Sequence, residues 1–272
     1  MPNPDLQSFL QSQTLKSPIA VILAEDEVEL DSTVRHHAAQ GFGTILVVGA
    51  VGQTAFQDLD NTHTFFDELN QLEDSLDILN QVIAQAQDKW IYYCFNAEYL
   101  FFPYCEDRTI KDVLTFMQEE RRTAVYTYAI DLYPENLSDH RSGVDVGSAH
   151  LDMSGYYGMD RFEGPDMVER QPEIFGGLRW RFEEHIPWEK RRIDRISMFK
   201  ATKGLTIGAD LRLSDPEMNT IVMGIKQMFP SGDDFAHWPT IMATSILAMI
   251  PPVIVVISMQ RLFIRGLVDS EK

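Results

Sequence analysis

Two apolar runs with a helical segment between them place the strongest constraint on the fold of this 272-residue chain. Residues 18–24 and 44–49 are almost entirely apolar, as expected for strands that are buried on both faces. Residues 29–40 have the composition of a helix, and Gly41 then supplies a stop signal. A strand, a helix and a strand in this order form a βαβ unit, which predicts two parallel strands joined by a right-handed crossover.

The chain then continues to alternate helices and strands. An apolar stripe at spacings of three and four predicts a helix over 65–87. A second amphipathic pattern predicts a helix over 109–120 that begins with a capping box at Thr109 and Asp112. Residues 134–175 are rich in Pro, Gly, Asp and Ser and lack periodicity, which is typical of a functional loop or lid. Three further strands are expected, over 90–95, 124–130 and 192–199.

The net charge of −18 is distributed unevenly along the chain. Residues 218–272 carry as many basic as acidic residues, so all of the excess negative charge lies in residues 1–217. This shift predicts a boundary between a domain 1–217 and a segment 218–272. The acidic surface argues against a nucleic-acid partner, because phosphates bind clustered Lys and Arg. Cys94 and Cys105 have neither a zinc nor a disulfide-framework spacing, which indicates a reducing compartment.

Polar side chains follow three of the expected strands at the point where each ends. They are Glu25, Asp26 and Glu27 after the first strand, Asn96 and Glu98 after 90–95, and Asp131 after 124–130. Ligands bind outside the carboxyl ends of the strands in open α/β sheets, so these residues are candidates for a binding site. Two simpler interpretations stay open. The acidic residues also suit the first turn of a helix, and Asn96-Ala97-Glu98 also suits a solvated turn.

A second candidate region combines glycine, basic and aromatic residues. Gly176 and Gly177 precede Arg179 and Arg181, and residues 190–195 add further basic side chains. Glycines beside basic residues suit an anionic ligand that backbone amides approach closely. Acidic residues interleave with them, so a surface network of salt bridges is an equally good interpretation.

Residues 239–259 contain no charged residue. At about 1.5 Å per residue, such a helix would cross the roughly 30 Å of bilayer hydrocarbon. We therefore expect a transmembrane helix over about 239–262, in preference to a buried core helix. Acidic residues precede it and basic residues follow it, which would place the C-terminus in the cytoplasm. Domain 1–217 would then need translocation, although its N-terminus does not have the form of a signal peptide.

Three stretches in the first domain carry a resemblance to a known family. They are AVILAEDEVELDSTVRHHAAQGFGTILVVGA, FNAEYLFFPYCEDRTIKDVLTFMQEERRTAVYTYAIDLYPENL and FGGLRWRFEEHIPWEKRRIDRISMFKATKGL. Through them, residues from about 18 to 217 resemble a bacterial family 2-type glycosyltransferase. The resemblance implies an α/β fold with a GT-A-like Rossmann-type sheet and flanking helices, here followed by one transmembrane helix. It also implies transfer of a sugar from a nucleotide-sugar donor to an acceptor, with Mg²⁺ or Mn²⁺ held by an Asp-x-Asp signature.

The resemblance assigns roles to individual residues. Asn96 and Glu98 stand at the metal signature, with one carboxylate fewer than the family has, which weakens the expectation of a metal and of catalysis. Glu98 and Asp131 are the implied catalytic residues, with Asp131 as the general base that takes the acceptor's proton. The remaining implied ligand-binding residues face the nucleotide, the acceptor or the departing diphosphate: Glu25, Asp26, Glu27, Arg179 and Arg181.

Residues 218–272 resemble the C-terminal end of ABC-importer permeases for sn-glycerol-3-phosphate, most specifically in RLFIRGLVDSEK. This resemblance implies ABC-importer subunits as partners and the bacterial inner membrane as the location. Because the N-terminus contains nothing that directs export, we expect the main domain in the cytoplasm, against the orientation that the charges around 239–262 favour. The other spans and the EAA-type coupling loop are missing, and one span cannot form an alternating-access path. Three functions stay open: a membrane-associated glycosyltransferase, a permease component, and a hybrid gene product with neither activity.

Overall fold

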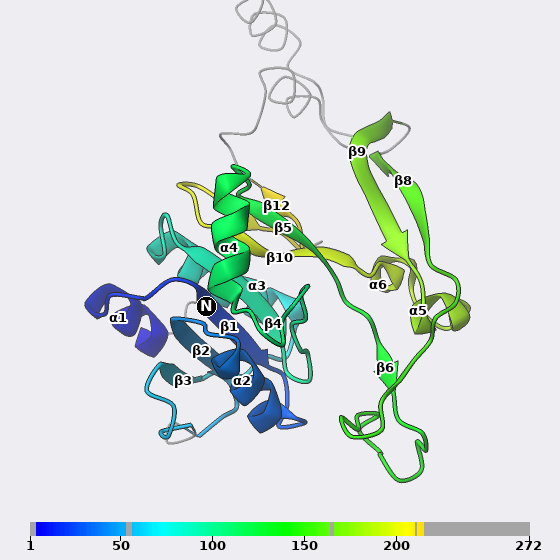
Figure 1. Cartoon of the computed structure of the whole chain (residues 1–272), viewed down its shortest axis with the longest axis horizontal. Helices are drawn as coiled ribbons and strands as arrows, with labels where there is room; N and C mark the ends of the chain where they lie inside the picture. Colours follow the sequence, from blue (N-terminus) through cyan, green and yellow to red (C-terminus); the bar gives the residue numbers. More distant parts are fainter. Residues whose placement is uncertain (1–3, 53–55, 164–165, 210, 215–272) are drawn as a thin grey trace, which may run out of the picture. The chain divides into compact units, whose positions relative to one another are not determined.

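The computed structural model describes residues 4–52, 56–163, 166–209 and 211–214. Its centre is a six-stranded sheet in the order β3-β2-β1-β4-β10-β5 (Figure 1). The strands are β1 (Ile19–Ala24), β2 (Thr44–Gly49), β3 (Thr62–Phe66), β4 (Trp90–Phe95), β5 (Ala124–Tyr128) and β10 (Asp194–Lys200). The pairs β3–β2, β2–β1 and β1–β4 are parallel. The strand β10 is antiparallel to both β4 and β5.

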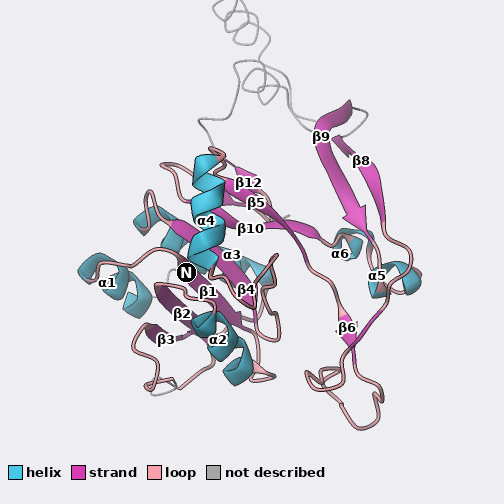
Figure 2. Cartoon of the chain, viewed as in Figure 1, coloured by secondary structure: helices cyan, strands magenta, loops and turns pink. Residues whose placement is uncertain are grey.

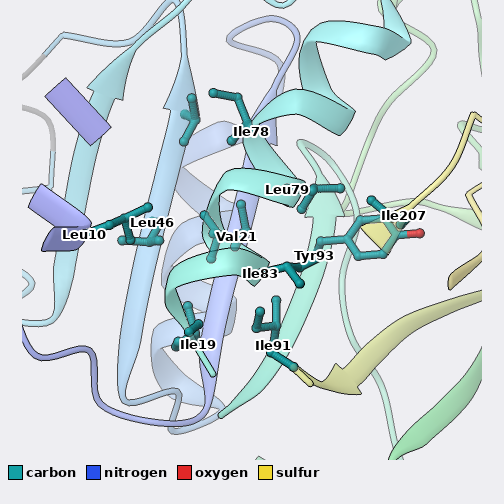
Figure 3. Close-up of a cluster of buried hydrophobic side chains, with 14 of the residues drawn as sticks. Leu10, Ile19, Val21, Leu46, Ile78, Leu79, Ile83, Ile91, Tyr93 and Ile207 are labelled. Atoms are coloured by element: carbon teal, nitrogen blue, oxygen red, sulfur yellow. The ribbon is translucent and has the colours of Figure 1, made fainter. Parts of the chain in front are cut away.

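Helices cover both faces of the sheet, which is why β1 and β2 are buried along their whole lengths. The helices α1 (Pro4–Ser12) and α3 (Leu72–Gln85) pack on one face, where they bury side chains such as Leu10, Ile78 and Leu79 (Figure 3). The helices α2 (Leu30–Ala39) and α4 (Ile110–Glu119) pack on the other face through apolar side chains such as Val34 and Leu114. The result is a three-layer α/β domain (Figure 2).

Most of the expected elements are confirmed. The parallel pairing of β1 with β2 confirms the βαβ unit, and α4 begins with the expected capping box, in which the carboxylate of Asp112 accepts the N–H of Thr109 at 2.8 Å. The expected helix over 65–87 is wrong at its start, because 62–66 forms the edge strand β3. This segment buries Phe65 and exposes Phe66, which is the alternation of a strand, and a new cap at Gln71 starts α3.

The region expected to be an irregular loop, 134–175, contains short strands. The strand β6 (Leu132–Tyr133) pairs with β7 (His150–Leu151), and β8 (Tyr157–Glu163) pairs with β9 (Asp166–Phe175). We call residues 132–175 the arm. After it come two short helices, α5 (Leu178–Arg181) and α6 (Trp188–Arg191), and after β10 the small pair β11 (Thr206–Ile207) and β12 (Leu213–Ser214).

The fold class needs one correction. The α/β sheet with flanking helices agrees with expectation, but the transmembrane helix does not: within the described ranges, no helix combines the length and apolar character needed to cross a membrane. The segment 239–262 to which we assigned that helix lies outside the described residues, so we withdraw the helix from the fold class. The first compact unit of the chain ends at Ser214. The boundary between 217 and 218 also lies outside the described residues and stays a prediction.

Candidate functional site

The strand order reverses at the boundary between β1 and β4. From β1 the chain crosses to β2 and β3 on one side, and it then returns to place β4 on the other side of β1. In open α/β sheets this reversal opens a crevice at the carboxyl ends of the two strands. Residues 25–29 leave β1 there, and residues 96–98 leave β4 there. The structure thus brings together four of the predicted site residues: Glu25, Asp26, Asn96 and Glu98.

Asn96 ties the two polar loops to each other. Its side-chain oxygen accepts the N–H of Glu25 at 3.0 Å. Its side-chain amide donates to the carboxylate of Asp26 at 2.6 Å and to the carbonyl of Val28 at 3.1 Å. All the polar atoms of the Asn96 side chain therefore have partners inside the protein, and its observed role is to fasten the loop after β4 to the loop after β1.

Glu98 forms an ion pair with Arg195. Its two carboxylate oxygens accept separate bonds from the guanidinium, one at 3.0 Å and one shorter, and the same carboxylate also accepts the N–H of Phe95 at 2.8 Å. The side chain of Arg195 is 12% exposed and that of Glu98 is 29% exposed. Burial lowers the pKa of Arg195, but the carboxylate of Glu98 outweighs this effect and holds that pKa above its ordinary value. Arg195 therefore keeps its positive charge at this largely buried position.

The backbone of both loops adopts unusual conformations. Ala97 lies in the left-handed region with a φ of 58°, and its N–H is held by the hydroxyl of Thr33 at 2.9 Å. Glu29 has a φ of 51°, and its carboxylate accepts the hydroxyl of Ser32, which contacts the hydroxyl of Tyr99 at 2.7 Å. Non-glycine residues in this region persist where surrounding contacts hold them, and they concentrate at functional sites.

Glu25 lies in an electrostatically mixed environment. Burial raises the pKa of its carboxyl group, the neighbouring carboxylates of Asp26 and Glu98 raise it further, and the ammonium group of Lys190 opposes them. Lys190 belongs to α6. No carboxylate pairs with Lys190 within the described part of the chain, whereas the nearby arginines have acidic partners: Arg179 with Asp131, Arg181 with Asp152, Arg191 with Glu183, Arg192 with Glu173 and Asp194, and Arg195 with Glu98.

A groove of about 370 Å³ adjoins the loop after β1. Glu27, another predicted site residue, lines it together with the apolar side chains Leu30, Val51 and Phe56. Arg35 lies on the same wall and pairs with Asp31 at 2.9 Å and with Asp58 at 2.7 Å. The groove thus combines an apolar wall with carboxylates, which suits a ligand that has both a flat apolar part and hydroxyl groups.

The three remaining predicted site residues, Asp131, Arg179 and Arg181, take part in two separate ion pairs. Arg179 donates two bonds to the carboxylate of Asp131, at 2.5 and 2.9 Å, and a third bond to the carbonyl of Arg192 at 2.7 Å. Arg181 donates to Asp152 and, together with Ser154, holds the pKa of Asp152 below its ordinary value. Arg179 and Arg181 therefore bind acidic residues of the protein, but these are not the interleaved acidic residues on which the salt-bridge interpretation rested.

The residues at the metal signature do not fit a divalent ion as they stand. Metals of this class need free carboxylate or carbonyl oxygens, but those of Asn96 and Glu98 accept bonds from the protein. Across the described ranges, no three or more His, Cys, Asp or Glu residues are grouped so that they would hold a metal ion. The expected Mg²⁺ or Mn²⁺ with a nucleotide sugar stays a prediction.

Sequence reasoning missed the residues that fix this site. Arg195 was noted only as a basic residue near a glycine pair, and Thr33 was not singled out. Because β10 runs antiparallel to β4, its first residues lie beside the end of β4, which brings Arg195 to Glu98. A single sequence gives no signal for a contact between positions so far apart.

Comparisons with known proteins reveal similarity to permease proteins and not to glycosyltransferases. No family model matches the chain. The sn-glycerol-3-phosphate transport system permease protein UgpE of Pectobacterium atrosepticum is 38% identical over 112 residues, which are 40% of this chain and 40% of that protein. The UgpE proteins of Escherichia coli O1:K1 and Shigella flexneri serotype 5b are 48% identical over 62 residues, 23% of this chain and 22% of each relative.

The chain therefore spans less than half the length of the curated relatives that it matches. These matches support the resemblance to a permease over part of the chain. The 112-residue match is longer than 218–272, so it extends beyond the segment to which we assigned this resemblance. The matches lend no support to the glycosyltransferase resemblance, which stays a prediction.

Proposed function

We propose that the described domain binds a phosphate-bearing nucleotide at the carboxyl ends of β1 and β4, and that a nucleotide sugar is the ligand to test first. The observation that carries this proposal is the reversal of strand order between β1 and β4, with polar loops at both strand ends. The groove beside Glu27 offers an apolar wall for a base, and Lys190 offers a cation for a phosphate.

Glycosyl transfer is the reaction class that we propose for this ligand. An inverting transfer needs a carboxylate that takes the acceptor's proton. Asp131 remains a candidate, but it must first be released from Arg179. Glu25 is the second candidate, because its pKa is raised towards the range in which a carboxylate accepts a proton more readily. Glu98 would act by holding the loop rather than by contacting a metal.

Calorimetry on the full chain with a panel of nucleoside diphosphates and their sugar conjugates tests the proposal. Lys190→Ala should weaken binding by about tenfold, because a hydrogen bond to a charged group is lost. Lys203→Ala removes the same charge from an exposed turn after β10 and should leave the affinity unchanged. If no nucleotide binds, or if both variants have equal effects, this proposal is wrong.

A second proposal follows from the comparisons, which favour it over glycosyl transfer. The chain would act as a component of an importer for sn-glycerol-3-phosphate, because its curated relatives are permease proteins of that transport system. ABC-importer subunits would be its partners, and the bacterial inner membrane its location.

Affinity purification of the tagged chain from bacterial cells, followed by mass spectrometry, tests the importer proposal. Recovery of an ABC ATPase subunit, together with uptake of labelled sn-glycerol-3-phosphate that depends on this gene, is the expected result. Failure of both this experiment and the nucleotide titration would favour a hybrid gene product with neither activity.

A further inference from the structure

We infer that Arg195 takes the place of a divalent cation at the end of β4, so that the corner formed by Asn96 and Glu98 does not bind a metal ion. The inference concerns residues of this chain and holds whether or not a nucleotide sugar is the ligand. It rests on the proposed function in one respect only: a phosphate-bearing ligand at this corner would bind equally well in the presence of a chelator.

The first argument is the use of the Glu98 oxygens. Both oxygens accept bonds from the guanidinium of Arg195, and one of them also accepts the backbone N–H of Phe95. A divalent ion needs short contacts to carboxylate oxygens and would lie next to a permanent positive charge. Arg195 therefore already neutralises the charge of Glu98 and occupies the oxygens that a metal ion would need.

The second argument is that Asn96 cannot replace the missing carboxylate. Its oxygen accepts a backbone N–H, and its amide group donates to Asp26 and Val28. Turning the amide over would direct N–H groups at the N–H of Glu25 and an oxygen at two acceptors. The side chain thus has one favourable orientation, and in that orientation its oxygen is occupied.

The third argument is that Arg195 is held firmly in place. It lies on β10, and its guanidinium carbon stands 5.4 Å from the ring centre of Tyr93 and 6.0 Å from that of Phe95. Cation–π contacts of this kind add to the ion pair where the cation is shielded from water. The charge at this corner is therefore part of the fold rather than a bound ion.

Binding of Mn²⁺ to the full chain, measured by the loss of the free-ion EPR signal, tests the inference without any nucleotide. We expect no difference between the natural chain and Glu98→Gln, and no new site in Asn96→Asp. The double variant Asn96→Asp/Arg195→Met adds one carboxylate beside Glu98 and removes the cation, and it should bind Mn²⁺ at least about tenfold more tightly than its control. The matched control is Asn96→Asp/Arg108→Met, which has the same net charge but loses an exposed arginine elsewhere.

Two results would overturn the inference. One is a site in the natural chain that disappears in Glu98→Gln, and the other is equal Mn²⁺ binding by the double variant and its control. Circular dichroism checks that each variant is folded. Asn96→Asp/Arg195→Lys retains a cation and should again lack the site, which a purely structural role of Arg195 does not predict. If the double variant does not fold, the comparison of the natural chain with Glu98→Gln still decides.

Failure of all nucleotides to bind would count against the proposed function and leave the Mn²⁺ result unaffected.

Discussion

The Glu98–Arg195 pair is a contact between residues far apart in the sequence, and we expect it to contribute strongly to the stability of the protein. Arg195→Ala leaves a half-buried carboxylate without its counter-ion, and we expect the free energy of unfolding to fall by about 3 kcal/mol. Arg195→Met/Glu98→Met removes both charges and should be less destabilised than the single variant, because no unpaired charge remains. Urea unfolding of the full-length variants measures both. Equal losses in the single and double variants would contradict this account.

Ala97 offers a test of the strained loop after β4. Its left-handed conformation costs a residue with a Cβ atom roughly 1 kcal/mol, which glycine does not incur. Glycine also raises the conformational entropy of the unfolded chain, which opposes this gain. Ala97→Gly should therefore stabilise the protein slightly or leave its stability unchanged. Ala84→Gly, on the exposed side of α3, is the matched control and should lower the stability by about 0.5–1 kcal/mol. A larger loss at Ala97 than at Ala84 would show that the conformation is not strained.

His37 makes the stability depend on pH. Burial lowers its pKa to about 4, a shift that the bond from its ring to the carbonyl of Thr33 partly offsets. The unfolded chain, with a histidine pKa near 6.5, therefore binds more protons than the folded chain between these values. The stability contributed by neutral His37 is present above about pH 6.5 and is lost as the pH falls towards 4, by roughly 3 kcal/mol in all.

Denaturant unfolding at pH 7, 6 and 5 measures this dependence. His37→Gln keeps a polar side chain but does not titrate, so it should lose less stability than the natural chain over this range. Glu25 titrates in the opposite sense, because its folded pKa is raised, and it contributes equally to both proteins. A pH dependence that is identical in the two proteins would exclude His37 as its source.

At the scale of elements, Asp194 connects the arm to the sheet. Its carboxylate accepts the N–H of Ile174 in β9 at 2.6 Å and the hydroxyl of Tyr126 in β5 at 3.0 Å, and its side chain is only 4% exposed. Asp194→Ala would remove the acceptor of the Ile174 N–H and leave the Tyr126 hydroxyl only the carbonyl of Pro172, at a cost of about 2 kcal/mol. We expect proteases to cleave within the arm at least several times faster than in the exposed control Asp107→Ala. Unchanged cleavage would mean that other contacts hold the arm.

An element can be predicted from the sequence where only one local pattern fits its residues. The strands β1, β2 and β4 were predictable because continuous apolar runs have few other solutions, and α4 because its cap and its stripe agree. The strand β3 was missed because Phe65 also fits the apolar stripe of the helix that follows. The positions of Asn96 and Glu98 at a strand end followed from topology, but their partners did not. Pairing with Arg195 depends on where β10 enters the sheet, and local patterns contain no information about this.

At the scale of the whole molecule, charge determines which large partners are excluded. The net charge of −18 lies on residues 1–217, and the arginines around α5 and α6 are bound to carboxylates. The excess of acidic residues in 1–217 repels the phosphates of a nucleic acid. Fluorescence anisotropy of a labelled DNA duplex should not change on addition of the protein at physiological salt. A salt-dependent rise in anisotropy would reveal a basic surface that the described residues do not present.

The position of β10 also has a consequence for biosynthesis. This strand occupies a place between β4 and β5, although it is made long after both of them. While a ribosome is still translating the arm, β4 and β5 lack the strand that lies between them, and Glu98 lacks its partner Arg195. Contacts between such distant positions form slowly and leave strand edges open in the meantime. Nascent chains halted before β10 should therefore depend on chaperones, whereas chains halted after it should not.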